Sequence, residues 1–196
     1  MDKDTIAELE ILLFDMVEEP GISANMMADT IGVLINLKPA MIGAFSKKGF
    51  KSSDVDKFET ILDKLCLERV YYDQYIFVSK KLKTAERTRR SFVELWSVID
   101  EGGRILNKKK WANVTKKIGK LLGYPKTAIK NFIKENDTED ETRMKRMERN
   151  RYYAHSAEYE DEEFKIYDQI LNSAISNLAP KTANFLSSNK KKRWLD

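Results

Sequence analysis

The spacing of apolar residues predicts a chain built mainly of helices. In most of the N-terminal part, apolar positions recur every three to four residues, which is the period of an amphipathic helix. Pro20-Gly21 ends the first of these segments, Pro39 suits the first turn of the third, and Ser53 is the predicted N-cap of the fourth. The predicted N-terminal helices cover residues 4–18, 22–37, 39–49 and 54–69.

One short segment has the pattern of a β-hairpin instead. Residues 70–78 (VYYDQYIFV) are aromatic and β-branched on both sides of Asp73-Gln74, which would form a two-residue turn. A stretch rich in lysine and arginine follows and runs through Arg90. We interpret the start of this stretch, near residues 79–86, as a linker between two domains.

The C-terminal part of the chain returns to the helical period. Pro180 is predicted to close the last helix, and the polar and basic residues after it are predicted to form a flexible tail. The predicted C-terminal helices cover residues 84–100, 108–122, 125–135, 140–157 and 161–178.

Together these elements predict a mainly α fold. We expect a helical bundle that contains a trihelical, helix-turn-helix-like unit and one small β-hairpin. The chain then divides into an N-terminal helical subdomain with the hairpin, a C-terminal helical domain, and a flexible basic tail. The corresponding residues are 1–80, 84–180 and 181–196.

The composition fits a globular protein with a densely charged surface. Hydrophobic residues make up 42% of the chain and charged residues 34%, above the usual share of about a quarter. Cys66 is the only cysteine, which excludes an intrachain disulfide and a cysteine zinc site, and we expect it to be a buried, inert thiol. The chain shows no secretory leader and no apolar run of about 18 residues, which predicts a cytoplasmic protein, or a nuclear one in a eukaryote, without a membrane partner.

Charge is distributed unevenly along the chain. The net charge is only +4, yet residues 104–134 contain ten basic residues and no acidic one. Acidic clusters lie nearby at 135–141 and 158–163. The basic stretch is therefore the electrostatic footprint that a phosphate-binding protein would have.

Within this stretch, two predicted helices separate apolar from basic side chains. At about 100° per residue, the apolar residues of each helix fall in one arc, and the lysines lie opposite or beside it. Gly123 allows the first helix to end, and Pro125 suits the first position of the second. The apolar arcs consist of Trp111, Val114, Ile118, Leu121 and Leu122 in the first helix and of Ala128, Ile129, Phe132 and Ile133 in the second.

The polar faces of these two helices supply candidate nucleic-acid contacts. Lysines that neutralise phosphates add affinity through the release of counterions. Thr127 and Asn131 have short polar side chains that can reach base edges, and asparagine suits adenine. The predicted phosphate contacts are Lys116, Lys117, Lys120, Lys126, Lys130 and Lys134.

Residues 112–134 resemble the helix-turn-helix family of DNA-binding proteins. That family has a small residue, a glycine four positions later, and apolar residues around the turn and in the second helix. The matching positions are Gly119, Gly123, Ile118, Leu122, Tyr124, Ile129 and Phe132. The resemblance implies that the second helix enters the major groove. We therefore expect a regulatory, nucleic-acid-binding protein that prefers DNA to RNA.

The helix over 54–69 and the hairpin after it resemble the helix and wing of winged-helix domains. Contact between this helix and DNA is disfavoured because its carboxylates would repel phosphates. We expect a scaffold or self-association role here, which leaves a homodimer open, with the aromatic hairpin residues packed in the core or on a second subunit. The acidic residues are Asp54, Asp56, Glu59, Asp63 and Glu68, and the aromatic ones are Tyr71, Tyr72, Tyr75 and Phe77.

The only histidine supports an enzymatic alternative. Arg149-Asn150 followed by His155 resembles the motif of the HEPN ribonucleases, which are helical proteins that dimerise. The resemblance implies metal-free RNA cleavage, in which His155 assists attack of a 2′-hydroxyl on its own phosphate and Arg149 stabilises the developing charge. An unbroken helix would align Arg151 with His155 but would not align Arg149 with it.

No other catalytic arrangement stands out in the sequence. A glycine-rich phosphate loop, a recognisable cysteine–histidine pair and a nucleophile elbow are all missing, and one histidine excludes a multi-histidine metal site. We therefore predict no cofactor and no metal. The third alternative is a non-catalytic structural or partner-binding helical protein, in which the lysine faces are simply solvated.

Overall fold

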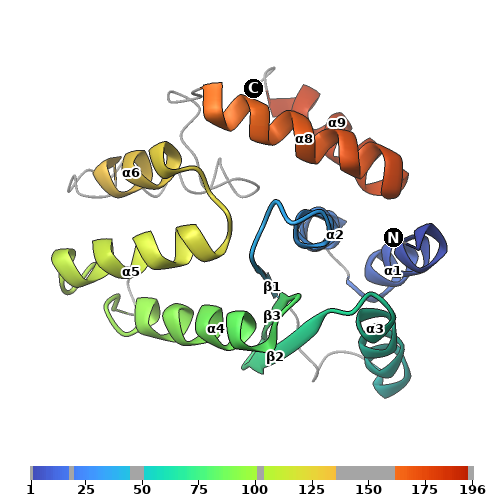
Figure 1. Ribbon diagram of the computed structural model, residues 1–196, viewed down its shortest axis with the longest axis horizontal. Helices are drawn as coiled ribbons and strands as arrows, with labels where there is room; N and C mark the ends of the chain where they lie inside the picture. Colours follow the sequence, from blue (N-terminus) through green and yellow to red (C-terminus); the bar gives the residue numbers. More distant parts are fainter. Residues whose placement is uncertain (1, 18–19, 45–50, 101–103, 136–161, 194–196) are drawn as a thin grey trace.

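The computed structural model describes residues 2–17, 20–44, 51–100, 104–135 and 162–193. Helices make up most of these residues, as the sequence predicts, and a small antiparallel sheet lies among them (Figure 1). The prediction of a mainly α fold is therefore confirmed. The predicted helix over 140–157 lies outside the described residues.

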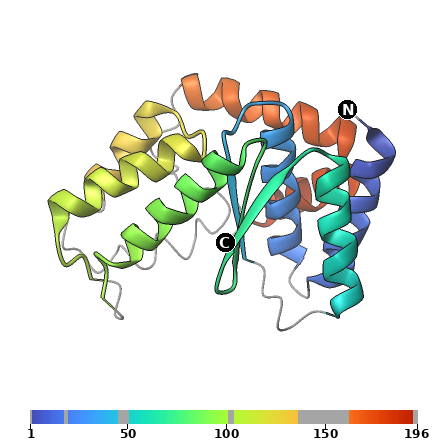
Figure 2. The same cartoon turned by 60° about the horizontal axis from the view of Figure 1, so that its bottom comes forward.

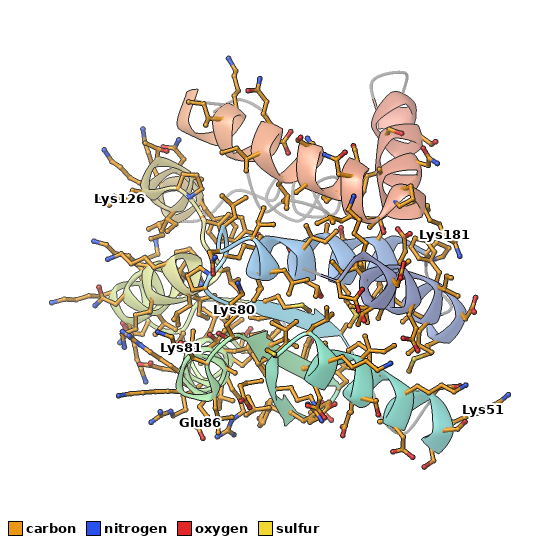
Figure 3. All side chains as sticks on the ribbon, turned by 45° about the vertical axis from the view of Figure 1, so that its right-hand side comes forward. Lys51, Lys80, Lys81, Glu86, Lys126 and Lys181 are labelled. Atoms are coloured by element: carbon orange, nitrogen blue, oxygen red, sulfur yellow. The ribbon has the colours of Figure 1, made fainter. Side chains whose placement is uncertain are left out.

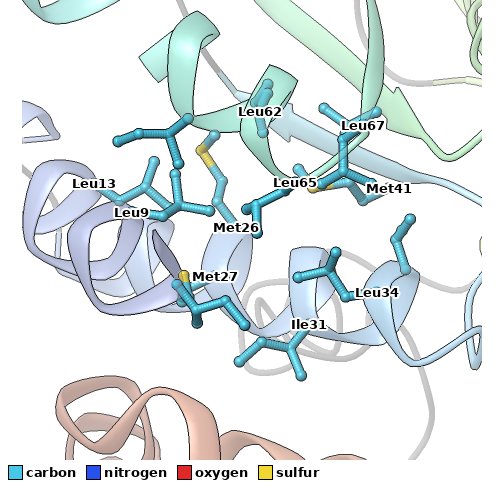
Figure 4. Packing of buried hydrophobic residues seen from close by; sticks show 14 of the residues in the cluster. Leu9, Leu13, Met26, Met27, Ile31, Leu34, Met41, Leu62, Leu65 and Leu67 are labelled. Atoms are coloured by element: carbon cyan, nitrogen blue, oxygen red, sulfur yellow. The ribbon is translucent and has the colours of Figure 1, made fainter. Parts of the chain in front are cut away.

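The main core forms between the first two helices and the elements that cover them. These are α1 (Lys3–Met16) and α2 (Pro20–Leu34), and both begin and end within three residues of the prediction. The Asp2 side chain accepts a hydrogen bond from the Asp4 N–H and so caps α1. Figure 4 shows how leucine, isoleucine and methionine side chains of both helices interdigitate with those of the next helix and the sheet.

The sheet has three strands rather than the two of a hairpin. β2 (Glu68–Tyr72) and β3 (Tyr75–Ser79) pair as predicted, and β1 (Met41–Ala44) adds to the free edge of β3, with Met41 opposite Val78. The predicted third helix from Pro39 is therefore wrong. Pairing with the buried β3 imposes a strand on a segment that has little strand preference of its own. Within β1, Met41 and Gly43 are buried and Ala44 is exposed.

The helix before the hairpin is shorter than predicted. α3 (Ser52–Lys64) has Lys51, not Ser53, at its N-cap position, and it ends because Cys66 has a φ of 55° and Glu68 already belongs to β2. The Cys66 and Leu67 N–H groups bond back to Asp63 O and Leu62 O, which is the Schellman pattern. Cys66 is exposed on this turn, so the prediction of a buried thiol is wrong.

The predicted helix over residues 84–100 is present, but it begins at Leu82, within the segment 79–86 that was predicted to be a linker. α4 (Leu82–Trp96) contacts β2 and β3 and buries one side against them (Figure 2). Phe92 anchors this side, with its ring centroid 4.7 Å from that of Tyr75 and 5.4 Å from that of Phe77. The strong amphipathic spacing of α4 thus outweighs the high local charge that indicated a linker.

Two C-terminal helices complete the core. α8 (Glu162–Leu178) matches its prediction within one residue. Pro180, which was predicted to close the last helix, is instead the first residue of a further helix, α9 (Pro180–Arg193). The buried Glu10 carboxylate accepts a hydrogen bond from the Thr182 N–H at 2.6 Å and so caps α9. The predicted flexible tail from residue 181 is therefore wrong, since proline also suits the first turn of a helix.

Candidate nucleic-acid interface

The basic stretch folds into two helices joined by a short turn. They are α5 (Lys108–Leu121) and α6 (Lys126–Glu135), which differ from the predicted bounds by one residue. The Asn107 side chain caps α5 by accepting a bond from the Lys110 N–H at 2.9 Å. Pro125 lies just before α6, and its carbonyl accepts the Ile129 N–H. Four residues thus separate the two helices, a length typical of helix-turn-helix units.

The turn between α5 and α6 depends on Gly123. Its φ is 76°, a left-handed conformation that glycine adopts without cost. The Gly123 N–H bonds to Lys120 O and the Tyr124 N–H bonds to Gly119 O, which completes a Schellman motif like the one after α3. The prediction that Gly123 ends the first helix is confirmed.

A second glycine allows α6 to approach α5 closely. A Cβ atom at Gly119 would lie only 2.7 Å from Cγ1 of Ile129, so any larger residue would push the two helices apart. The Trp111 and Phe132 rings also meet, with centroids 6.2 Å apart. Close packing against Ile129, one of the predicted apolar residues of α6, thus explains why Gly119 occupies the position where a small residue was predicted.

The predicted apolar arcs face the interior. Trp111, Val114 and Ile118 on α5 and Ala128 and Ile129 on α6 are buried. The remaining members of the two arcs are half-buried at the ends of the interface, namely Leu121, Leu122, Phe132 and Ile133. The polar faces must therefore point outwards.

The residues predicted to contact nucleic acid lie on these outward faces, with two qualifications. All six lysines and Thr127 are exposed, whereas Asn131 is half-buried at the border of the apolar arc. Lys117 forms an ion pair with Glu94 of α4, with 3.3 Å between Nζ and Oε2. Among these lysines, Lys117 alone forms an ion pair within the described part of the chain.

The turn is fixed to the N-terminal half of the molecule. Residues after α2 form another Schellman turn, with Asn36 at a φ of 62°, and a Cβ at Gly123 would lie 2.8 Å from the Leu37 carbonyl oxygen. The Ala40 N–H also bonds to Leu121 O at 3.0 Å. The two helix ends are thus packed backbone to backbone.

A buried cation supports this junction. The Lys38 side chain is 4% exposed, forms an ion pair with Asp29 of α2, and lies over the Tyr124 ring, with Nζ 5.6 Å from the centroid. Burial raises the pKa of the Tyr124 hydroxyl, although the Lys38 charge opposes the shift. These contacts hold the start of α6 against α2.

Three further cations lie next to the predicted ones. Lys83, Arg87 and Arg90 are exposed on α4. This helix packs beside α5 and carries Glu86, which Figure 3 labels. The spacing of the three cations, four and three residues, places them on one helix face, opposite the buried Ala85, Thr88 and Phe92. The sequence contains this signal, but the predicted binding surface is confined to residues 104–134 and leaves these three cations out.

The acidic helix and the hairpin form a region of paired charges. Arg69 forms ion pairs with Asp63 and Glu59, and Lys64 forms one with Glu8, with 3.3 Å between Nζ and Oε2. The Tyr71 hydroxyl donates to Glu59 at 2.8 Å, and burial, together with this bond, raises its pKa. Of the predicted hairpin aromatics, Phe77 is fully buried in the core and Tyr72 is exposed, while Tyr71 and Tyr75 are half-buried.

Arg149, Arg151 and His155, the residues of the nuclease hypothesis, lie outside the described residues. Within the described ranges, no group of three histidine, cysteine, aspartate or glutamate side chains is placed to hold a metal ion.

Comparisons of the chain with protein-family models, with curated proteins and with solved structures found no match. In the described parts of the chain, no helix is long and apolar enough to span a bilayer.

Proposed function

We propose that this protein binds nucleic acid, with double-stranded DNA as the preferred partner, through the polar faces of α5 and α6. The observation that carries the proposal is the arrangement of lysines on this helix pair. Lys116, Lys120, Lys126, Lys130 and Lys134 are exposed and form no ion pair with any other described residue. Residues 104–134 contain no carboxylate side chain, and the only one in the two helices is that of Glu135, the last residue of α6.

The rigidity of the helix pair supports the proposal further. A surface that binds a regular duplex needs its cations at fixed relative positions, because ordering flexible groups on binding costs free energy. The Gly119–Ile129 contact and the Schellman turn at Gly123 fix α6 on α5. The lysines therefore project from a preformed frame.

DNA is preferred because of the uncharged residues on α6. Thr127 is exposed in the first turn of the helix and Asn131 lies one turn further, where both can reach base edges if α6 enters a major groove. The deep and narrow major groove of duplex RNA would not admit the helix.

Binding to fluorescently labelled duplex DNA, measured by anisotropy over a range of salt concentrations, tests the proposal. The Lys126→Ala/Lys130→Ala variant should lose at least about tenfold in affinity, and the slope of log K against log salt should fall by about 1.8. The matched control is Lys51→Ala/Lys57→Ala, which removes the same charge from exposed positions at and after the start of α3.

Two outcomes would contradict the proposal. The first is that the wild-type protein shows no affinity for any duplex at low salt. The second is that both double variants weaken binding equally, since the attraction would then follow from net charge and not from the α5–α6 surface. A preference for duplex RNA over DNA would overturn the major-groove component.

A further inference from the structure

We infer that α4 is part of the DNA-contacting surface, so that Lys83, Arg87 and Arg90 bind phosphates several base pairs away from those contacted by α6. This inference rests on the proposed function and extends its site. It depends on the position of α4 in the fold, because the three residues are separated from α6 by more than thirty positions in the sequence.

α5 lies between α4 and α6. It contacts both helices, and Figures 1 and 2 show the three side by side. Packed helix axes are about 8–10 Å apart, so the α4 and α6 axes are separated by about 16–20 Å. With a rise of about 3.4 Å per base pair, this separation corresponds to about five or six base pairs. One duplex could thus contact both helices.

The Lys117–Glu94 ion pair shows which side of α4 carries the cations. Glu94 reaches Lys117 on α5, so the Glu94 face of α4 borders the lysine face of α5. Arg90 and Arg87 lie four and seven residues before Glu94, and Lys83 lies four before Arg87, so all three share this face. The basic row on α4 therefore adjoins the basic row on α5.

The other side of α4 is already occupied. Ala85, Thr88, Ser91 and Phe92 are buried against neighbouring elements, which leaves only the cationic face available to a partner. Lys83, Arg87 and Arg90 form no ion pair with any residue that the structure describes. Their charge is therefore available for phosphates, as is that of the lysines on α6.

The test is the Lys83→Gln/Arg87→Gln/Arg90→Gln variant, in which glutamine keeps the helix propensity and removes the charge. The salt slope for duplex DNA should fall by about 2.7, so that the affinity lost between about 50 and 200 mM salt becomes about 40-fold smaller than in the wild type. The control, Lys51→Gln/Lys57→Gln/Lys64→Gln, removes the same charge from exposed positions at and within α3. Circular dichroism checks that both variants are folded.

Duplex length provides an independent measurement. Lengthening the duplex stem of a DNA hairpin from about 5 to about 12 base pairs, so that one duplex becomes able to span both helices, should strengthen wild-type binding more than binding by the α4 variant. Glu94→Gln should act in the opposite direction to the triple variant, because it releases Lys117 for a phosphate and should raise the salt slope by up to about 0.9.

The possible failures can be told apart. If the α4 variant keeps the wild-type slope and length dependence while the Lys126/Lys130 variant loses binding, the inference is wrong and the proposed function stands. If neither protein binds duplex DNA, both are wrong. If the α4 variant loses binding but the Lys126/Lys130 variant does not, α4 carries a site of its own and the proposed role of α6 is wrong.

Discussion

Two helices of this protein, α3 and α5, end in the same left-handed turn but differ in how their charges are used. On the α3 side, Arg69 is neutralised by Asp63 and Glu59, and Lys64 pairs with Glu8. On the α5–α6 side, Lys117 alone of the six predicted lysines forms such a pair among the described residues. A structural helix therefore differs from a candidate binding surface in the partners of its charged side chains, and not in how many such side chains it has.

The turns themselves also differ in their surroundings. Cys66 after α3 is exposed, whereas Gly123 after α5 is packed against the backbone of residues 37–38. The same hydrogen-bond pattern therefore ends α3 at the surface, whereas after α5 it lies against residues 37–38 and so joins two parts of the molecule. Substitutions at these turns and at the charged residues near them test the contrast.

Gly123→Ala should cause the largest loss of stability. The new Cβ would have to occupy a left-handed position and would lie 2.8 Å from the Leu37 carbonyl oxygen, so we expect a loss of about 3 kcal/mol in the free energy of unfolding. The matched change Cys66→Ala at the exposed turn should cost less than about 0.5 kcal/mol. Urea denaturation followed by circular dichroism measures both; equal losses would contradict the distinction between the turns.

Removing a paired cation should lower the free energy of unfolding more near α3 than near α5. The Arg69 side chain is 19% exposed and binds two carboxylates, so Arg69→Met should lower the free energy of unfolding by about 1–2 kcal/mol. Lys117→Met removes an exposed ion pair and should cost no more than about 0.5 kcal/mol. The same denaturation experiment tests this prediction, and a larger loss for Lys117→Met would reverse it.

Cys66→Gly should stabilise the protein. At a φ of 55°, cysteine is in a left-handed backbone conformation that is strained for it and that glycine adopts freely. If the Schellman turn keeps its geometry, we expect the free energy of unfolding to rise by about 0.5–1 kcal/mol. The thermal midpoint should rise accordingly. A fall in the midpoint would show that the thiol makes a contribution that its exposed position does not indicate.

The smallest effect concerns alkaline pH. The folded-state pKa of Tyr71 lies above the ordinary value of about 10, because of burial first and then its bond to Glu59. Its contribution to stability is therefore complete below about pH 10 and is lost as the pH rises further, since the unfolded chain then releases the proton first. Tyr71→Phe should flatten this alkaline loss, as measured by urea midpoints between about pH 9 and 11. A loss as steep as that of the wild type would contradict the prediction.

Much of the candidate interface was predictable from local pattern. The helices around Trp111 and Ile129, the turn at Gly123 and the exposure of the lysines follow from helical periodicity and from the special conformation of glycine. Asn131 was predicted to be accessible but is half-buried, because its position at the border of the apolar arc depends on how far α6 tilts into its neighbours.

The errors arose where a distant partner decides the local structure. Met41–Ala44 forms a strand only because β3 offers it an edge, and the chain after Pro180 forms a helix that Glu10 caps from 172 residues away in the sequence. Residues 82–86 are predicted to be part of a linker because the local charge is high, although they begin the helix whose apolar face covers the hairpin.

The helical character of this protein, its hairpin and the basic helix pair follow from local sequence pattern, because those features depend on contacts between residues close together in the chain. The neutralisation of particular cations, the position of α4 beside α5 and the contact between the turns at Asn36 and Gly123 follow only from the folded arrangement. These features depend on the packing of segments remote in sequence, where burial and close backbone approach outweigh local preference.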